Sequence, residues 1–150
     1  MKHRISAGAI IEHEGRILLV RYRAAGGVEF WVAPGGGAEG TEDLPDAARR
    51  ETKEETGIDI HVDRMLYVEE FHDAVTRFCK VWFTASLTGE TVPRRTPGAA
   101  AEGIVEAAWL SRDEICARIV FPDVLKGRYW EDRNAGFATV HHLSMHPMTF

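Results

Sequence analysis

The chain has 150 residues, of which 45% are hydrophobic and 27% charged, so we expect one compact domain, residues 1–150, with a sizeable core. Its net charge of −5 argues against a nucleic-acid-binding surface, for which a basic footprint is expected. The first apolar run has only a strand's length and lacks a cleavage site, which argues against a membrane span or a signal peptide. Two cysteines without a C-x-x-C pair suit reduced thiols, and we expect a cytoplasmic location.

The first part of the chain predicts a β-hairpin followed by a glycine loop. Apolar runs at residues 5–11 and 17–20 flank a turn that contains Gly15, as in a hairpin. A short apolar strand at residues 30–32 then leads into residues 33–37. Three consecutive glycines in this segment predict a loop whose backbone can approach a metal ion or a phosphate closely.

The glycine loop leads into a predicted helix that starts after Asp43 and ends at Gly57. Asp43 suits the N-cap and Asp46 stands in the capping-box position. Pro45 lies in the first turn, where a missing amide hydrogen costs little. Gly57 suits the left-handed residue that follows a helix C-terminus. We therefore expect one well-delimited helix in the first half of the chain.

Three carboxylates share one narrow face of this helix. At about 100° per residue, Glu54 lies about 60° to one side of Glu51, and Glu55 lies about 40° to the other. Like charges at this spacing repel, and Arg50 relieves only part of the repulsion. A divalent cation would remove it, and hard oxygen ligands suit Mg²⁺ or Mn²⁺. The alternative is a solvated acidic helix face.

The rest of the chain alternates strands and short helical segments. Strands are expected at residues 58–71, 77–87, 104–110 and 138–145. The apolar residues of the second strand do not alternate perfectly, which indicates either a bulge or a sheet buried on both faces. Helical segments are expected at residues 111–118 and 121–133, and residues 91–101 form a polar loop. This order predicts an α/β fold with a mixed β-sheet covered on both faces.

Residues 36–58 resemble the signature of the Nudix hydrolase family, G-x5-E-x7-R-E-U-x-E-E-x-G-U, in which U is an aliphatic residue. Eight of its nine fixed positions are met, by Gly36, Glu42, Arg50, Glu51, Glu54, Glu55, Gly57 and Ile58. Thr52 stands where the signature has an aliphatic residue, and we expect this β-branched side chain to pack beside Ala48. The resemblance is to MutT-like members of this family. It implies an α/β/α sandwich with a mixed central sheet.

The resemblance also implies a function, namely water attack on the diphosphate linkage of a nucleoside diphosphate joined to another group. The implied cofactor is Mg²⁺, with Mn²⁺ as a substitute, and the implied partner is a small phosphorylated nucleotide. The implied metal ligands are Glu51, Glu54, Glu55 and the carbonyl group of Gly36, while Arg50 and Glu42 orient them. The alternative is a non-catalytic nucleotide-binding module, which predicts losses among the glutamates, and none is seen. The resemblance leaves a homodimer open.

The general base stays open between these carboxylates and Glu102, a loop residue that a solvated acid would explain equally well. Substrate contacts are expected from Gly37, Arg21 and Arg23, the two arginines pairing with phosphate unless they form surface salt bridges. Trp31 is expected to stack a nucleobase, although a strand alternates its faces and one of Phe30 and Trp31 belongs in the core.

Overall fold

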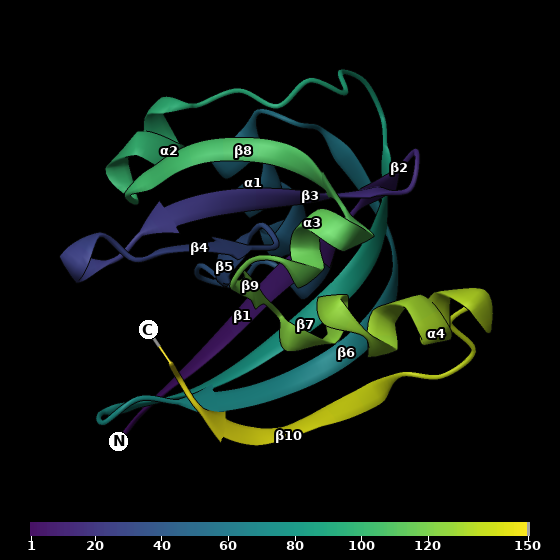
Figure 1. Cartoon of the computed structure of the whole chain (residues 1–150). Coiled ribbons are helices and arrows are strands. Elements are labelled where there is room, and N and C mark those ends of the chain that lie inside the picture. The colour runs from purple at the N-terminus through teal and green to yellow at the C-terminus, as the bar shows by residue number, and fades with distance from the viewer. Residues whose placement is uncertain (150) are drawn as a thin grey trace.

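Two mixed β-sheets form the centre of the computed structural model, which describes residues 1–149 (Figure 1). The first sheet has the order β10-β6-β7-β1-β5, and the second has the order β2-β3-β4-β9, with β8 also paired to β3. The strands of the first sheet are β1 (Lys2–Ile10), β5 (Gly35–Gly37), β6 (Ile60–His72), β7 (Thr76–Leu87) and β10 (His141–Pro147). Those of the second are β2 (Glu12–His13), β3 (Arg16–Arg23), β4 (Glu29–Val32), β8 (Ile104–Ser111) and β9 (Val120–Phe121).

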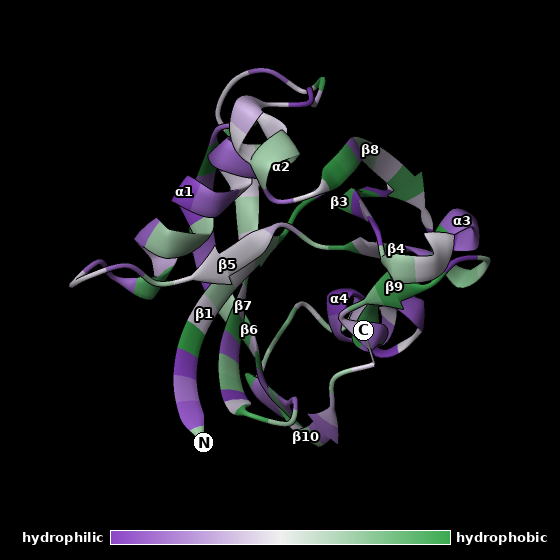
Figure 2. Cartoon of the chain, turned by 90° about the vertical axis from the view of Figure 1, so that its left-hand side faces the viewer, coloured by the Kyte–Doolittle hydropathy of each residue, from purple (hydrophilic) through white to green (hydrophobic). Residues whose placement is uncertain are grey.

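Helices lie on both sides of these sheets. In Figure 2, α1 (Leu44–Thr56) and α2 (Pro97–Ala101) lie on one side, and α3 (Arg112–Cys116) and α4 (Arg128–Asn134) lie on the other. Two single turns of 3-10 helix, η1 (Ala25–Gly27) and η2 (Asp123–Lys126), complete the described elements. The arrangement confirms the expected α/β fold with mixed strand pairing, but the strands are divided between two sheets where one was expected.

The expected hairpin forms only at its tip. The β2 and β3 strands pair around Glu14 and Gly15, both of which have positive φ angles, 52° and 75°. The β1 strand, however, pairs in parallel with β7 along its whole length and antiparallel with β5. Both edges of β1 are therefore occupied, and at Ile11 the chain passes from the first sheet into the second.

The three glycines form the short strand β5, which corrects the expectation of a loop. Gly35 pairs with Gly8, and Gly37 pairs with Ser6 of β1. A Cβ atom on Gly35 would lie 2.5 Å from the carbonyl oxygen of Ala7 and 2.6 Å from the Cα atom of Gly8. The two backbones are thus closer than a side chain would allow, and glycine is required for this close approach.

The central helix α1 has the predicted bounds, and its last residue is followed by Gly57 in the left-handed region (φ 75°). Its buried face includes Ala47 and Ala48, which pack against β1 and β7. Thr52 is fully buried, and its hydroxyl donates to the carbonyl of Ala48 over 2.8 Å, so the polar group in the aliphatic position is satisfied. Asp43 occupies the N-cap position, but its side chain caps no amide. The predicted capping box is therefore wrong.

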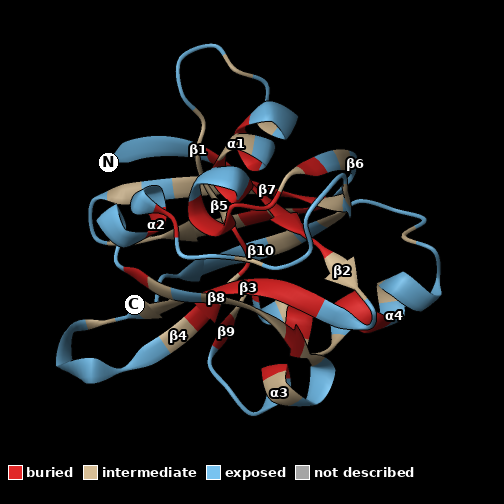
Figure 3. Ribbon diagram, turned by 90° about the horizontal axis from the view of Figure 1, so that it is seen from above, coloured by how far each residue is buried: buried red, intermediate tan, exposed pale blue. Residues whose placement is uncertain are grey.

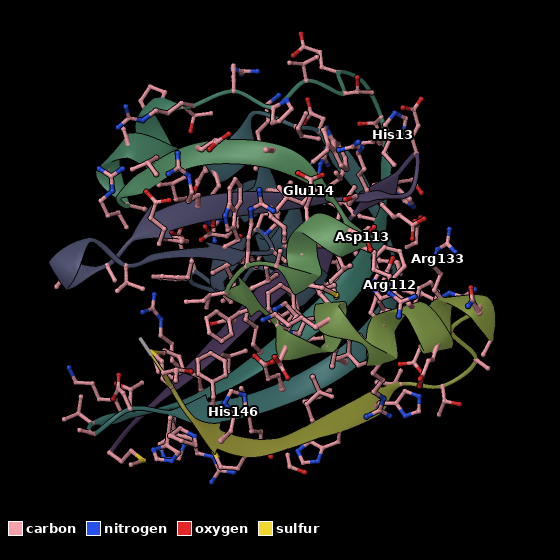
Figure 4. All side chains as sticks on the ribbon, in the orientation of Figure 1. His13, Arg112, Asp113, Glu114, Arg133 and His146 are labelled. Atoms are coloured by element: carbon pink, nitrogen blue, oxygen red, sulfur yellow. The ribbon has the colours of Figure 1, made fainter. Side chains whose placement is uncertain are left out.

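The second half follows the expected order with local differences. The β6–β7 pairing has two register shifts, as a bulge requires, but both extra residues lie in β6. The predicted loop at residues 91–101 contains α2, and the predicted helical segment at 121–133 is divided into β9, η2 and α4. Ser111 and Glu114 cap α3 reciprocally, at the point where Figure 4 labels Glu114.

Buried residues concentrate in β1, β3 and the inner face of α1, as the red segments of Figure 3 show. The largest cluster joins both sheets to α4, through Trp31 of the second sheet, Tyr67 and Trp82 of the first, and Tyr129 and Trp130 of the helix. Among residues 1–149 the longest helix has 13 residues, and none is both long and apolar enough to cross a membrane.

Candidate functional site

The acidic residues of α1 divide into two groups. Carboxylate oxygens of Glu51, Glu54 and Glu102 lie within 4.8 Å of one another, so the loop acid Glu102 joins two of the three predicted helix carboxylates. Glu55 turns towards β5, where one of its oxygens accepts a hydrogen bond from the Gly35 amide over 3.3 Å. The sequence named both the helix glutamates and the loop acid Glu102 as candidates, and the structure brings Glu102 together with Glu51 and Glu54.

The carboxylate of Glu51 packs directly against Gly36, in space that a side chain at position 36 would fill. The side chain of Glu51 is buried, and its Oε2 atom has no hydrogen-bond partner among the described residues. The Oε2 atom of Glu55 is likewise buried and unpartnered. Buried carboxylate oxygens without partners are costly, and a bound cation would satisfy them. The carboxylates of Glu51, Glu54 and Glu102 meet beside Gly36. Carboxylate oxygens are hard donors, so this donor set fits a divalent cation such as Mg²⁺.

Adding a methyl group at Gly36 is expected to displace the carboxylate of Glu51. The new Cβ atom would lie 2.5 Å from both Cδ and Oε1 of Glu51, so the carboxylate must move. We expect Gly36→Ala to weaken Mg²⁺ uptake by roughly tenfold to a hundredfold, as measured by titration calorimetry. Gly89→Ala is the control, since its Cβ atom would meet nothing within 4 Å. Equal Mg²⁺ affinity in the two variants would contradict a role for Gly36 in positioning the Glu51 carboxylate.

Arg50 connects the carboxylates of this site. Its guanidinium donates to Glu42 over 2.6 and 3.1 Å, to Glu51 over 3.0 Å and to Glu54 over 3.2 Å. It also donates to the carbonyl of Gly37 over 3.1 Å, which ties α1 to β5. The hydrogen bond from Arg50 holds the pKa of Glu42 below its usual range, and the same pair raises the pKa of Arg50. The predicted orienting pair is therefore brought into contact with the cluster.

The loop before β8 is fixed to the C-terminal end of α1, which places Glu102. The Thr96 hydroxyl donates to the carbonyl of Glu54 and accepts from the amide of Ala99 at the start of α2. The Arg94 amide donates to the carbonyl of Thr56 over 2.9 Å. Burial raises the pKa of Glu102, and the nearby charges of Glu51 and Glu54 add to that rise.

Glu55 is 1% exposed, and its carboxyl group has a pKa well above the usual value of 4.5, first because of burial. The charge of Lys80 opposes this rise, whereas Glu102 and Glu51 add to it. An acid with a raised pKa in the folded state contributes stability below its unfolded pKa and loses it as the pH rises through the folded value. Glu55 therefore destabilises the metal-free fold as it ionises.

This predicts a pH-dependent effect of Glu55→Gln. In EDTA, the free energy of unfolding of the variant relative to the wild type is expected to increase as the pH rises from 4.5 to neutrality, because glutamine has no charge to bury. Urea unfolding at several pH values measures this difference. A difference that does not change with pH would contradict the raised pKa.

The predicted substrate contacts Arg21, Arg23 and Trp31 lie on the face of β3 and β4 opposite to the face that carries Tyr22 and Phe30. Arg21 pairs with Glu29 and Glu106 over 2.7 and 2.9 Å, and Arg23 pairs with Glu29 over 3.1 Å. Trp31 is 8% exposed and belongs to the core. The salt-bridge alternative therefore describes both arginines, and Trp31 is the one of Phe30 and Trp31 that belongs to the core.

Tyr22 and Phe30 occupy the opposite face and stack on each other, with ring centroids 5.3 Å apart and an interplanar angle of 12°. Burial is the main cause of the raised pKa of Tyr22, and the negative charges of Glu55, Glu102 and Glu51 add to the rise. This proximity places the aromatic pair beside the acidic cluster. Side chains alternate between the two faces of a strand, so choosing the neighbours of Arg21 and Trp31 would have identified Tyr22 and Phe30 from the sequence.

A cavity of about 780 Å³ lies beside the acidic cluster and is lined from both sheets. Its lining is mostly apolar and aromatic, with charged groups at intervals: Tyr22, Phe30, Val32, Ala33, Gly35, Glu69, Phe71, Lys80, Trp82, Phe121, Asp123, His146, Met148 and Thr149. The ring of His146, labelled in Figure 4, stacks on Phe71 with centroids 5.8 Å apart. Glu69 is 8% exposed, and burial raises its pKa. Sequence reasoning gave no role to Lys80, Trp82 or Asp123.

The fold and the site together define a class of protein: a mixed α/β domain in which a glycine strand and a glutamate-bearing helix form an acidic site beside an aromatic cavity. A sequence model described as "NUDIX domain" matches residues 2–130, and the chain therefore belongs to the Nudix hydrolase family. It is 32% identical over 116 residues to "Nudix hydrolase 2" of Arabidopsis thaliana, an alignment that covers 75% of this chain and 40% of that protein.

Solved structures agree with this assignment. The NUDIX hydrolase from Nitrosomonas europaea has a TM-score of 0.74 and 27% identity, with 90% of each chain covered. The MutT NUDIX hydrolase from Burkholderia pseudomallei has a TM-score of 0.61 and 30% identity, with 77% of this chain and 88% of that chain covered. The present chain spans less than half of its plant relative, so the comparison concerns the domain and not the whole plant protein.

Proposed function

We propose that this protein is a divalent-metal-dependent hydrolase that cleaves the diphosphate linkage of a nucleoside diphosphate joined to another group. The observation that carries the proposal is the meeting of Glu51, Glu54 and Glu102 within 4.8 Å beside the glycine strand. All carboxylates of the family signature are present, whereas a non-catalytic module would tolerate their loss. Arg50 donates hydrogen bonds to Glu51 and Glu54 and so orients these two carboxylates, as ligands of a metal ion require.

The residues that would hold Mg²⁺, or Mn²⁺ in its place, are Glu51, Glu54, Glu55 and the carbonyl group of Gly36. A bound divalent cation supplies neutralisation of phosphate charge and a lowered pKa for water. Burial of Glu51 and Glu55 restricts their rotamers, so these side chains present their oxygens at fixed positions. Arg50 and Glu42 orient the set through the hydrogen bonds described above.

The cavity supports a nucleoside as one part of the substrate. Stacked aromatic rings at Tyr22 and Phe30 suit the face of a planar base, and a volume of about 780 Å³ falls in the range of small-molecule sites. Glu69 and Asp123 line the same cavity and offer hydrogen-bonding groups to a base edge. The chain's negative net charge is compatible with a small nucleotide partner, whose phosphates would meet the metal ion and local cations.

Glu102 is our choice for the general base. Its carboxylate joins the cluster from the loop side, and burial raises its pKa, which makes it a stronger proton acceptor than an exposed glutamate. We expect Glu102→Gln to lower kcat by roughly a hundredfold or more and to remove the acidic limb of the pH–rate profile. Steady-state kinetics across pH measures both. An unchanged profile would exclude Glu102 as the base, and Glu90→Gln serves as a control at an exposed loop acid.

The proposed reaction is tested by a panel of compounds in Mg²⁺: nucleoside diphosphate sugars, dinucleoside polyphosphates, nucleoside triphosphates and a nucleoside monophosphate as the negative control. Product analysis should show cleavage between phosphorus atoms in at least one diphosphate class, none in the monophosphate, and loss of activity in EDTA. Cleavage of none of these classes, or equal activity in EDTA, would contradict the proposal.

A further inference from the structure

The glycines of β5 face charged side chains in an alternating pattern. The Cε atom of Lys80 lies 3.1 Å from the position of a Cβ atom on Gly35. The guanidinium atoms of Arg4 lie between 2.9 and 3.3 Å from the corresponding position on Gly37. Residues two apart in a strand point to the same side, so both cations lie on one face of β5, roughly 7 Å apart along the strand. The Glu51 carboxylate lies on the other face.

Among the described residues, Arg4 has no carboxylate partner. Within residues 1–149 it makes no salt bridge, in contrast to Arg21, Arg23 and Arg50. It is exposed, yet it lies close enough to the acidic cluster for its charge to oppose the burial-induced rise in the pKa of Glu102. A guanidinium that lies beside a glutamate cluster without bonding to any of its carboxylates is available to an anionic ligand, and its planar fork suits phosphate oxygens.

Lys80 occupies the cavity end of the same face. Its ammonium group lies 4.2 Å from the ring centroid of Trp82, and the residue lines the cavity. Lys80 is paired directly across the β6–β7 ladder with Glu69, but among the described residues the two make no salt bridge. Its ammonium group therefore lies between the aromatic cavity and the acidic cluster, where the phosphates of a nucleotide held in the cavity would pass.

We propose that Arg4 and Lys80 form a phosphate cradle across the glycine strand, in which Lys80 contacts the phosphate nearer the nucleoside and Arg4 contacts the phosphate farther from it. This inference rests on the proposed function for the identity of the substrate. Glycine at positions 35 and 37 leaves room for the two side chains, whose charges offset those of the diphosphate on the side away from Glu51. The cradle thus requires a substrate with two adjacent phosphates.

Calorimetric titration with methylenediphosphonate in Mg²⁺ tests the cradle, because this probe has two phosphorus atoms, no base and a bridge that resists hydrolysis. We expect Arg4→Ala and Lys80→Met each to weaken binding by about tenfold to a hundredfold, as for loss of a charged hydrogen bond. Arg23→Ala removes an equal charge from a paired arginine and should bind as the wild type does. Arg4→Lys should recover part of the lost affinity, since it restores the charge without the fork.

Three results would overturn the cradle: no binding of the probe by the wild type, wild-type affinity in Arg4→Ala, or an equal loss in Arg23→Ala. Arg4 is exposed, so Arg4→Ala keeps the test valid even if circular dichroism shows that Lys80→Met is unfolded. Binding that depends on Arg4 without hydrolysis of any compound in the panel would reject the proposed reaction and retain the cradle. Hydrolysis of a compound in the panel, together with probe binding that does not depend on Arg4, would reject the cradle and retain the proposed reaction.

Discussion

Glu54→Gln is expected to lower turnover by about two orders of magnitude or more, while the stability of the metal-free protein stays equal or rises. Glu54 belongs to the cluster with Glu51 and Glu102, so its loss removes a ligand oxygen where the metal ion would bind. Without metal, the same change relieves repulsion between like charges. The Glu54 side chain is 46% exposed, so its salt bridge with Arg50 contributes little that would offset this relief.

The two effects of Glu54→Gln are separated by measuring turnover in Mg²⁺ and thermal unfolding in EDTA. Glu90→Gln is the matched control, because Glu90 is exposed and lies in a 3.6 Å pair with Arg94 outside the cluster. Turnover should be unchanged in the control. Full activity in Glu54→Gln, or a large loss of stability in EDTA, would indicate that the carboxylate is structural.

Arg50→Met is expected to reduce both stability and turnover. The substitution leaves Glu42, Glu51 and Glu54 without their shared cation and removes the hydrogen bond to the Gly37 carbonyl. Breaking a fully buried ion pair costs about 3–5 kcal/mol, but the Arg50 side chain is 22% exposed and solvent screens part of the interaction. We therefore expect a loss of about 2 kcal/mol in EDTA, as measured by urea unfolding.

Mg²⁺ should recover part of this stability, because a bound cation offsets the same carboxylates. Arg16→Met is the control: Arg16 forms a single 3.0 Å pair with Glu114, and both side chains are at least 40% exposed. We expect its effect to stay within about 0.5 kcal/mol. If Arg50→Met were no more harmful than this control, the carboxylates would not depend on Arg50.

The sequence predicted the bounds of α1 and the face that carries Glu51 and Glu54 well, because both depend on local rules. Helix bounds follow from Asp43 and Gly57, and the shared face of Glu51 and Glu54 follows from helix periodicity. The burial of Thr52 beside Ala48 followed from side-chain size alone, and the hydrogen bond between them explains why the hydroxyl is tolerated. The side-chain cap at Asp43 failed, and Pro45 supplies no amide hydrogen at this helix start.

What the sequence did not predict depends on contacts between distant segments. The face of β3 that carries Tyr22 rather than Arg21 is set by β8 and α2, which arrive about 80 residues later. The proximity of Glu102 to α1 depends on the contact between Thr96 and Glu54, and the pairing of β1 with β7 limits the expected hairpin to its tip. The position of Lys80 against Gly35 likewise requires β7, β1 and β5 to be adjacent in one sheet.

The most direct test of the account is calorimetric titration of the wild-type protein with Mg²⁺, and separately with Mn²⁺, in the presence of a nucleoside diphosphate derivative. The account predicts saturable uptake that is strongly weakened when Glu51, whose buried Oε2 atom otherwise has no partner among the described residues, is changed to glutamine. If neither ion binds, or if Glu51→Gln binds as tightly as the wild type, the acidic cluster is not a metal site and the proposed hydrolysis loses its physical basis.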